Sequence, residues 1–406
     1  MALNRAFPKM PPELIFVLSC AKYTETDKEK TNALMTPNID WDRVLRLAIT
    51  HRLFPLVYNT LNSLDKTSVP EYVIKTLQQH CIKNALKVVS ITNEIVRIIN
   101  QMGENEIQPL ILKGSPLSVK INEDSVFRPT NDIDILVDPL EFARAEKVLE
   151  QMGYKRYSPD FSLTPWQQKA YFKRHHHFEY FHLKRAISVE LHWRIRSFNI
   201  KRFPTSSNLS TQKINIAGCL VPVMDDEYWL LFLMVHGYKH MWSRLRWLYD
   251  IKEFMKINVD WDKIVIQADI SELRPILHQT LILVNKLFDV AIPNRMEESV
   301  ANDHKAWKLA YTVLGKLFTI ENNLPSTKSP FKKDLLINLN YFNFTWENKV
   351  FSLFSLLKPS EREFKLISLP DILYPLYYIV KPFHWLWKRI LKFGNCMVVD
   401  KQKSNK

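Results

Sequence analysis

Only seven of the 406 residues are glycine, whereas 22 are proline. Tight β-hairpins often need glycine where the backbone takes a positive φ, so this composition disfavours a fold built mainly from short hairpins. Proline ends helices, and frequent proline with little glycine is typical of long helices that stop abruptly.

Cysteine is also rare, and long apolar runs are missing. The four cysteines, at positions 20, 81, 219 and 396, form no Cys-x-x-Cys pair, which argues against a zinc cage or a disulfide framework. The first residues show no basic-then-apolar signal segment, and no run of about 18 apolar residues predicts a spanning helix. The sequence therefore predicts a reducing, cytoplasmic setting.

Acidic residues are outnumbered by basic ones, 42 to 56, and the formal net charge is +14. This excess indicates a polyanionic partner, such as nucleotide phosphate, nucleic acid or an anionic membrane face, with solubility alone as the alternative. Hydrophobic residues at 46% and charged residues at 24% describe an ordinary globular protein. At this length we expect two or three domains.

The order of expected elements predicts an α+β fold. Residues 1–106 and 225–345 show helical spacing, and residues 346–406 form a basic, aromatic C-terminal region. Residues 107–224 read as strand, helix, strand, helix and then two hairpins, which is the order of a mixed β-sheet domain. We therefore expect a mixed-sheet domain flanked by N-terminal and C-terminal α-helical regions.

Single elements can also be predicted. A long helix should run from near Pro70 to Gly103, and another, capped by Asp225 or Asp226, should run through Phe254 without a break. Later helices are expected at Glu272–Phe288 and Asn302–Phe318. The expected strands are Pro109–Leu112, Asp132–Val137, Phe178–Leu183, Ile187–Trp193 and a hairpin over 213–223.

Two aspartates stand two residues apart in the apolar run Asp132-Ile133-Asp134-Ile135-Leu136-Val137. Alternate side chains of a strand share a face, so Asp132 and Asp134 should point the same way. Like charges side by side repel each other, and a divalent cation with oxygen ligands, such as Mg²⁺, removes that repulsion. The pair therefore predicts a metal site.

A glycine-serine corner, Lys113-Gly114-Ser115, lies just upstream of the aspartates. Such a turn can hold phosphate through its backbone N–H groups and its hydroxyl. A metal site together with a phosphate site indicates chemistry on a nucleotide.

Glu190 is the one acid in the apolar strand Ile187–Trp193, and His192 shares its face. Two metal ions can bind the attacking and leaving oxygens of phosphoryl transfer, and a third carboxylate usually holds the second ion. A buried, unpaired glutamate is costly, so Glu190 should have a metal or a basic partner.

In this order the motifs resemble the nucleotidyltransferase fold shared with DNA polymerase β. The fuller set is similar to an uncharacterised nucleotidyltransferase family often found near bacterial polysaccharide-synthesis genes. The matching segments are Leu112-Lys113-Gly114, Arg128-x-x-Asn131-Asp132-Ile133-Asp134, Val189-Glu190-Leu191-His192-Trp193, His236-x-x-x-His240-x-Trp242-x-Arg244-Leu245-x-Trp247-Leu248-x-Asp250, and the flanking Trp41…His51-Arg52 and Leu376–Pro382. They span nearly the whole chain, with Lys381 standing where relatives more often have arginine.

The resemblance implies transfer of a nucleoside monophosphate from an NTP such as ATP to an acceptor hydroxyl, with release of pyrophosphate. It implies catalytic and metal-binding roles for Asp132, Asp134 and Glu190, which would hold two Mg²⁺ ions, with Mn²⁺ as the alternative. The implied nucleotide-binding residues are Lys113, Gly114, Ser115, Arg128, His192, His236, His240, Arg244 and Asp250. The acceptor stays open between a sugar, a lipid-linked saccharide, a protein and an RNA.

Structural readings compete with these roles. The two aspartates also fit a solvated strand end or a helix-capping pair. Glu190 fits an ion-pair partner of Arg128 or Arg194, and Lys113 and Arg128 fit plain surface charges. For the whole protein, the alternatives are a non-catalytic nucleotide- or RNA-binding protein and a membrane-associated partner of polysaccharide-synthesis enzymes.

One face of a straight helix from Asp225 would carry a stripe made up of His236, His240, Trp247 and Asp250. A His pair at i, i+4 can ligate metal, but Gly237 and Tyr238 replace the glutamate that a zinc protease motif needs. The stripe predicts a face towards the nucleotide, with Lys239 or Arg244 reaching phosphate, or a helix interface with hydrogen-bonded histidines.

Aromatic and basic side chains are mixed in residues 360–406, where the apolar piece Ile372–Val380 is too short to span a membrane. Rings at the headgroup level and cations on anionic lipid would bring this region into peripheral contact with the inner membrane face. The alternative is that its aromatic residues pack on the protein's own core.

Overall fold

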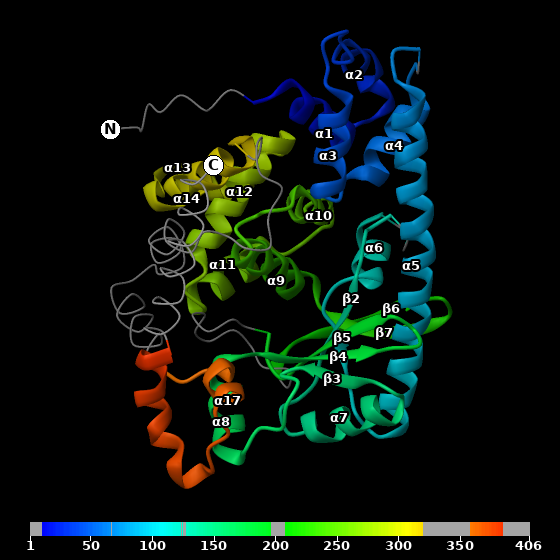
Figure 1. Ribbon diagram of the computed structural model, residues 1–406. Helices are drawn as coiled ribbons and strands as arrows, with labels where there is room; N and C mark the ends of the chain where they lie inside the picture. The colour runs from blue at the N-terminus through cyan, green and yellow to red at the C-terminus, as the bar shows by residue number, and fades with distance from the viewer. Residues whose placement is uncertain are drawn as a thin grey trace, which may run out of the picture. The chain divides into compact units, whose positions relative to one another are not determined.

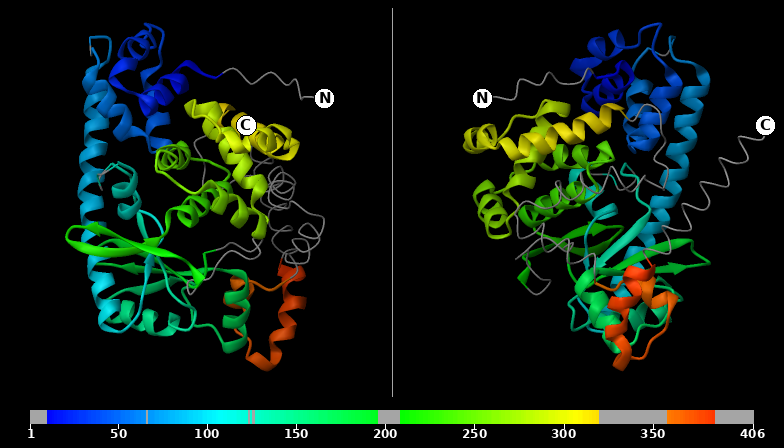
Figure 2. Two further views of the ribbon diagram at one scale, coloured as in Figure 1. Left: turned by 180° about the vertical axis from the view of Figure 1, so that it is seen from behind. Right: turned by 60° about the vertical axis from the view of Figure 1, so that its left-hand side comes forward.

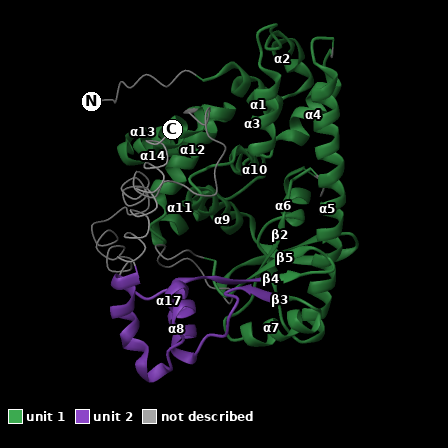
Figure 3. Cartoon of the chain, viewed as in Figure 1, with its two compact units in different colours: residues 1–155, 180–195, 200–329 green, residues 156–179, 196–199, 330–406 purple. Residues whose placement is uncertain are grey.

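The computed structural model describes residues 10–65, 67–122, 124, 127–195, 208–319 and 358–384. The chain divides into two compact units (Figure 3). Unit 1 comprises residues 1–155, 180–195 and 200–329, and unit 2 comprises residues 156–179, 196–199 and 330–406. The boundaries of the four segments predicted from the sequence stay a prediction.

Unit 1 begins with a group of helices (Figure 1). They are α1 (Pro12–Lys22), η1 (Glu25–Asp27), α2 (Lys28–Ala33), α3 (Trp41–Thr50), α4 (Phe54–Ser63) and α5 (Glu71–Glu104). The side chain of Asp40 caps α3 by accepting a hydrogen bond from the backbone N–H of Arg43 at 2.9 Å, as its position before Trp41 predicts.

α5 is the longest described helix and confirms the one predicted from Pro70 to Gly103. Figures 1 and 2 show it running from the N-terminal helices past the sheet, and it contacts α4, β2, α7 and β7. One side of it is buried through Val88, Ile91 and Ile95, whereas Ile82 and Leu86 are exposed. α5 therefore links the helical part of unit 1 to the strands that carry the acids.

A mixed five-stranded sheet has the order β1-β2-β5-β4-β3. Its strands are β1 (Leu110–Ile111), β2 (Asp132–Leu136), β3 (Lys155–Ser158), β4 (His177–His182) and β5 (Ile187–His192). β1 runs antiparallel to β2, and β5 runs parallel to β2. With α6 (Ser115–Asn122) and α7 (Phe142–Gln151) between strands, the sheet confirms the predicted α+β class. Of these elements, β3 was not predicted.

The second hairpin, β6 (Thr211–Ile216) with β7 (Cys219–Met224), confirms the hairpin predicted near Gly218. The helices after it are α9 (Asp226–Lys239), α10 (Leu245–Phe254), α11 (Trp261–Ile270), α12 (Arg274–Phe288), η3 (Asn294–Met296), α13 (Glu297–Asn302) and α14 (His304–Thr319). α12 and α14 confirm two predicted helices to within two residues at each end, and α11 was not predicted.

The unbroken helix predicted from Asp225 through Phe254 is wrong, because the chain turns between α9 and α10. Met241 and Trp242 both have left-handed backbones, with φ of 51° and 53°. The indole of Trp242 then packs on Gly237, where an added Cβ would lie 2.1 Å from the ring. The sequence hides this break because neither glycine nor proline stands in the turn.

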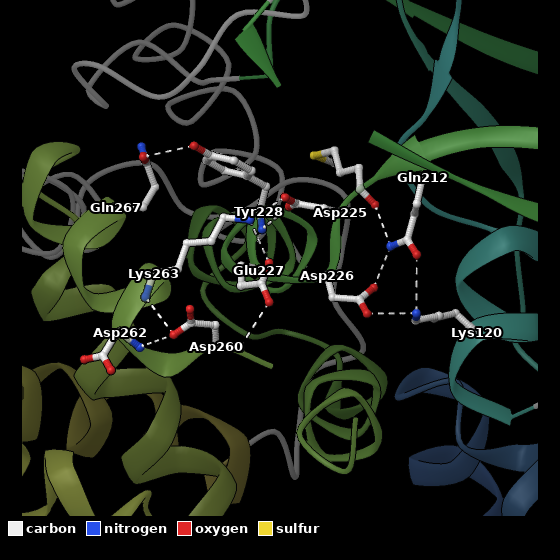
Figure 4. Close-up of polar contacts among 11 residues, drawn as sticks. Lys120, Gln212, Asp225, Asp226, Glu227, Tyr228, Asp260, Asp262, Lys263 and Gln267 are labelled. Atoms are coloured by element: carbon white, nitrogen blue, oxygen red, sulfur yellow. Dashed lines mark hydrogen bonds and ion pairs between the residues drawn. The ribbon is translucent and has the colours of Figure 1, made fainter. Parts of the chain in front are cut away.

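Charged contacts hold the N-terminal end of α9 (Figure 4). Asp226 accepts hydrogen bonds from Lys120 of α6 at 2.9 Å and from Gln212 of β6 at 2.6 Å. Asp225, the N-cap, pairs with Lys263 of α11 at 2.6 Å. These contacts fix α9 to three other elements and so set where its C-terminal end lies.

Unit 2 contains α8 (Pro165–Arg174), α17 (Glu361–Leu366), η4 (Asp371–Leu376) and a helical stretch over 377–384. Tyr377 is buried and its hydroxyl accepts a hydrogen bond from Gln167 of α8 at 2.9 Å. Phe364 is buried beside it, with ring centroids 4.9 Å apart. Part of the aromatic tail thus packs on the protein itself; residues 346–357 and 385–406 lie outside the described residues.

Among the described residues, no helix is both long enough and apolar enough to cross a membrane.

Candidate active site

The register of β2 and β5 brings the acids of two distant segments to one face. Asp134 lies directly opposite Glu190, and Asp132 lies opposite Ser188. Alternate residues of a strand share a face, so Asp132 and Asp134 lie on the side of the sheet that also carries Glu190. This register makes the three acids neighbours; it could not be read from the sequence, although Glu190 was expected to join the two aspartates.

His192 lies two residues beyond Glu190 on β5, and its ring is close to two of the carboxylates. Its Nε2 is 3.4 Å from Asp134 Oδ1 and 3.3 Å from Glu190 Oε2, and its side chain is only 6% exposed. Burial lowers the pKa of His192, but hydrogen bonds and charges of Asp134 and Glu190 outweigh it and raise the pKa above its ordinary value. The donor atoms of Asp134, Glu190 and His192 all lie within 4.8 Å of one another, so together they could hold a metal ion.

Lys113 supplies a second positive charge at the same carboxylates. Its Nζ is 3.0 Å from Asp134 Oδ2 and 3.7 Å from Asp132 Oδ2. Burial lowers the pKa of Lys113, but Asp134, Asp132 and Glu190 together raise it above its ordinary value. We call Asp132, Asp134, Glu190, Lys113 and His192 the acidic cluster.

The glycine-serine corner lies against this cluster. Gly114 has φ of +93°, a conformation that favours glycine. Two residues before it, the carbonyl of Leu112 accepts a 2.7 Å hydrogen bond from the indole N–H of Trp229 of α9. The hydroxyl of Ser115 is buried and shares a 2.7 Å hydrogen bond with Thr92 of α5. A phosphate at this corner would therefore meet the backbone, while the Ser115 hydroxyl holds the corner to α5.

Arg128 and Asp250 belong to a separate buried group. Asp250 Oδ2 accepts a hydrogen bond from Arg128 Nε at 2.9 Å, and its Oδ1 accepts one from Arg246 Nε at 2.8 Å. Arg246 also donates to the carbonyl of Phe127 at 3.0 Å. We call Arg128, Arg246 and Asp250 the arginine cluster. The sequence allows Glu190 as an ion-pair partner of Arg128, whereas in the structure Arg128 pairs with Asp250.

The C-terminal end of α9 and the start of α10 bring aromatic rings together. The ring of Trp247 lies 5.3 Å from His236 and 5.1 Å from His240, and the guanidinium of Arg244 lies 5.6 Å from its centroid. The stripe predicted on a straight helix is therefore wrong in its geometry. The turn after α9 nevertheless brings three of its four members together, and Asp250 lies in the arginine cluster instead.

Burial lowers the pKa of both His236, which lies in α9, and His240, which is its C-cap. Burial lowers the pKa of His240 to about 4, helped by the charges of Lys239, Lys113 and Arg244. Burial and the same Lys113 hold the pKa of His236 well below its usual range. The charge of Lys113 affects the pKa of both histidines, and the charge of Glu190 affects the pKa of Lys239. This end of α9 therefore faces the acidic cluster.

Two further cations near the cluster were not among the predicted site residues. Burial and the nearby Arg244 and Arg128 lower the pKa of Arg52 to about 10, whereas the charge of Asp132 opposes this. Lys87 of α5 donates a 2.8 Å hydrogen bond to Asn131, next to Asp132. Arg52 stands in a segment that matches the family, which was a usable signal, whereas Lys87 had none.

A family model described as an uncharacterised nucleotidyltransferase matches residues 37–289, which is more than half of the 406-residue chain. No curated protein matches the chain. The matched range contains the acidic cluster, the glycine-serine corner, His236 and His240. The chain therefore belongs to the uncharacterised nucleotidyltransferase family and is an enzyme that transfers nucleotidyl groups.

Proposed function

We propose that the protein transfers a nucleoside monophosphate from an NTP such as ATP to an acceptor hydroxyl in a divalent-metal-dependent reaction that releases pyrophosphate. The observation that carries the proposal is the convergence of Asp134 and Glu190 from parallel strands, beside Asp132 and next to the Lys113-Gly114 corner. Three carboxylates on one face beside a cationic corner fit the charge neutralisation that nucleotidyl transfer requires.

The donor set fits a divalent ion, which Asp132, Asp134 and Glu190 would hold; when bound, it neutralises charge on the reacting phosphate. Mg²⁺ is the ion implied by the family resemblance, with Mn²⁺ as the alternative. Glu190 keeps a side-chain exposure of 26%, so its carboxylate can reach an acceptor. We assign Glu190 the removal of the proton from the acceptor hydroxyl.

The triphosphate would lie among cations that flank the acidic cluster. Lys113 lies at the corner, and Lys239, Arg244 and Arg52 have pKa values that respond to the cluster's carboxylates. The backbone of Gly114 and Ser115 would hold the β- and γ-phosphates. Trp247, with His236 and His240, offers rings on which a base can stack. We assign Arg128 and Asp250 a structural role, which is to hold the chain near this site through the buried arginine cluster.

The acceptor hydroxyl belongs to a sugar, a lipid-linked saccharide, a protein or an RNA in this proposal. A sugar-based acceptor would agree with the polysaccharide-synthesis loci associated with the family resemblance. Incubation with labelled NTP and a cell lysate, followed by separation into these four classes, would identify the labelled acceptor.

The direct test is release of pyrophosphate from labelled NTPs by the full chain with Mg²⁺ or Mn²⁺. We expect release that is lost in Asp134→Asn and Glu190→Gln and kept in Glu104→Gln, a matched control on the exposed end of α5. Nucleotide binding without release in the unaltered chain would favour the non-catalytic alternative. Absence of both binding and release would contradict the proposal.

A second proposal concerns peripheral contact of the cytoplasmic protein with anionic lipid. Within unit 2, Ile372, Ile379 and Phe383 are exposed on η4 and the stretch 377–384, although their neighbour Tyr377 is buried. Exposed apolar side chains next to a basic sequence suit an anionic interface. We expect the chain to float with anionic vesicles and the triple variant Ile372→Ser, Ile379→Ser, Phe383→Ser to stay behind; equal recovery would contradict it.

A further inference from the structure

The two oxygens of the Asp134 carboxylate face two different cationic side chains. Oδ2 lies 3.0 Å from Lys113 Nζ, which Asp132 shares at 3.7 Å. Oδ1 lies 3.4 Å from His192 Nε2, which Glu190 shares at 3.3 Å. We call these two places the lysine position and the histidine position. Asp134 thus connects two sites for positive charge that differ in their chemistry.

The spacing at the histidine position is that of one coordination sphere. Ligand atoms bound about 2.1 Å from a metal ion lie about 3.0 Å apart at right angles and about 3.4 Å apart at tetrahedral angles. The separations of His192 Nε2 from Asp134 Oδ1 and Glu190 Oε2, 3.4 and 3.3 Å, fall in this range. Small side-chain movements would therefore place all three atoms on one ion.

The donor atoms at the histidine position do not favour Mg²⁺. Mg²⁺ takes oxygen ligands in nearly ideal octahedral geometry, whereas imidazole nitrogen suits first-row transition ions. His192 is buried at the end of β5, opposite Leu136 of β2, and this position keeps its nitrogen beside the two carboxylates. One nitrogen and two carboxylate oxygens fit Mn²⁺, which accepts both donor types.

The lysine position already contains a cation. The Lys113 ammonium is held by two aspartates and is 13% exposed. A divalent ion between Asp132 and Asp134 would lie a few Å from this ammonium and would be repelled by it. The ammonium therefore does at this position what a second ion would do, which is to neutralise the aspartates.

We propose that His192 Nε2 is a metal ligand together with Asp134 Oδ1 and Glu190 Oε2, and that the Lys113 ammonium replaces a second ion. The free protein then binds one transition ion, with Mn²⁺ preferred over Mg²⁺, in place of the two Mg²⁺ ions that the family resemblance implies. The use of this ion in catalysis rests on the proposed function, whereas the ligand assignment concerns metal binding alone.

The test measures metal binding by the full chain without nucleotide. Mn²⁺ binding is followed by electron paramagnetic resonance, Mg²⁺ binding by calorimetry, and the ligand by the ¹⁴N coupling in electron–nuclear double resonance of bound Mn²⁺. We expect one Mn²⁺ with nitrogen coupling in the unaltered chain. His192→Ala should lose the coupling and at least about 10-fold in Mn²⁺ affinity, because losing even a group that only hydrogen-bonds to a ligand costs about 10–100-fold. Its Mg²⁺ affinity should change less than about 3-fold.

Two variants complete the design. His182→Ala is the matched control, because His182 lies at the opposite end of the same β4–β5 hairpin, with its ring 5.2 Å from Tyr154, and should keep both the coupling and the affinity. Lys113→Met should bind a second Mn²⁺, because it removes the competing ammonium.

Absence of nitrogen coupling at bound Mn²⁺, two ions in the unaltered chain, or no Mn²⁺ binding would overturn the proposal. The coupling is read on the unaltered chain, so the result does not depend on whether His192→Ala folds. Nitrogen coupling without pyrophosphate release would reject the proposed function and support the ligand assignment. Release by a chain that binds two ions would do the reverse.

Discussion

Unit 1 contains two charged clusters, the arginine cluster and the acidic cluster, that differ in how closely their carboxylates are paired with cations. In the arginine cluster, each oxygen of Asp250 has its own guanidinium within 2.9 Å, and Asp250 is only 1% exposed. In the acidic cluster the corresponding separations run from 3.0 to 3.7 Å, and the side chains of Asp132 and Glu190 are 32% and 26% exposed. The first cluster is closed, whereas the second is open to solvent at Asp132 and Glu190.

The largest expected effect lies in the open cluster. Asp134→Asn removes a carboxylate that pairs with both Lys113 and His192. Because metal-borne charge stabilisation contributes several kcal/mol, nucleotidyl transfer should fall by about 10³-fold or more. The free energy of unfolding should also fall, because Lys113 and His192 lose the buried carboxylate that they share. A variant with normal pyrophosphate release would show that this carboxylate is not catalytic.

The closed cluster, which is the arginine cluster, should respond mainly in the free energy of unfolding. Asp250→Asn leaves Arg128 and Arg246 buried without their charged partner, which should lower the free energy of unfolding by about 3–5 kcal/mol. Urea denaturation measures this change. Asp269→Asn breaks the exposed ion pair with Arg274 and serves as the control, with an expected loss below about 1 kcal/mol. Equal losses in the two variants would remove the distinction between closed and exposed pairs.

Acid should lower the free energy of unfolding through His51, which contacts the start of α10 near the arginine cluster. His51 accepts a 3.3 Å hydrogen bond from the backbone N–H of Leu245 at the start of α10, and burial lowers its pKa from 6.5 to about 4. Between those values the unfolded chain binds a proton that the folded chain does not. Stability is therefore fully present above pH 6.5 and is lost as the pH falls, by about 2 kcal/mol at pH 5.

Urea denaturation at pH 7 and pH 5 measures this linkage, and His51→Gln provides the comparison because it has no titrating ring. The pH-dependent loss should be about 2 kcal/mol smaller in His51→Gln than in the unaltered chain. The same loss in both chains would show that His51 titrates normally in the folded state.

The smallest effect concerns the cations beside the open cluster. Arg52 is partly buried near Asp132, whereas Lys87 is exposed on α5. Arg52→Met should weaken nucleotide binding about 10-fold, and Lys87→Met should weaken it about 2-fold, because solvent screens an exposed charge. Titration with a fluorescent nucleotide at low and high salt measures both. A larger effect for Lys87 would place the triphosphate on the α5 side.

Much of the fold and the centre of the site were predictable from the sequence. The alternation of Asp132-Ile133-Asp134 and the helical spacing of α5 are local patterns, and they predicted both elements. The pairing of Arg128 with Asp250 joins residues 122 positions apart, and local pattern says nothing about such a contact. The turn at Met241 and Trp242 was also hidden, since neither residue type signals a left-handed backbone.

That turn sets a limit on how the protein can be stabilised. Two consecutive non-glycine residues in left-handed conformations each cost roughly 1–2 kcal/mol, so glycine at Met241 or Trp242 would relax the backbone. Glycine at position 242 would also remove the indole that fills the space over Gly237, and glycine at either position would loosen the turn that brings His240 to Trp247. A glycine placed here to stabilise the protein against heat would therefore relax the backbone and, at the same time, disturb the alignment of the rings.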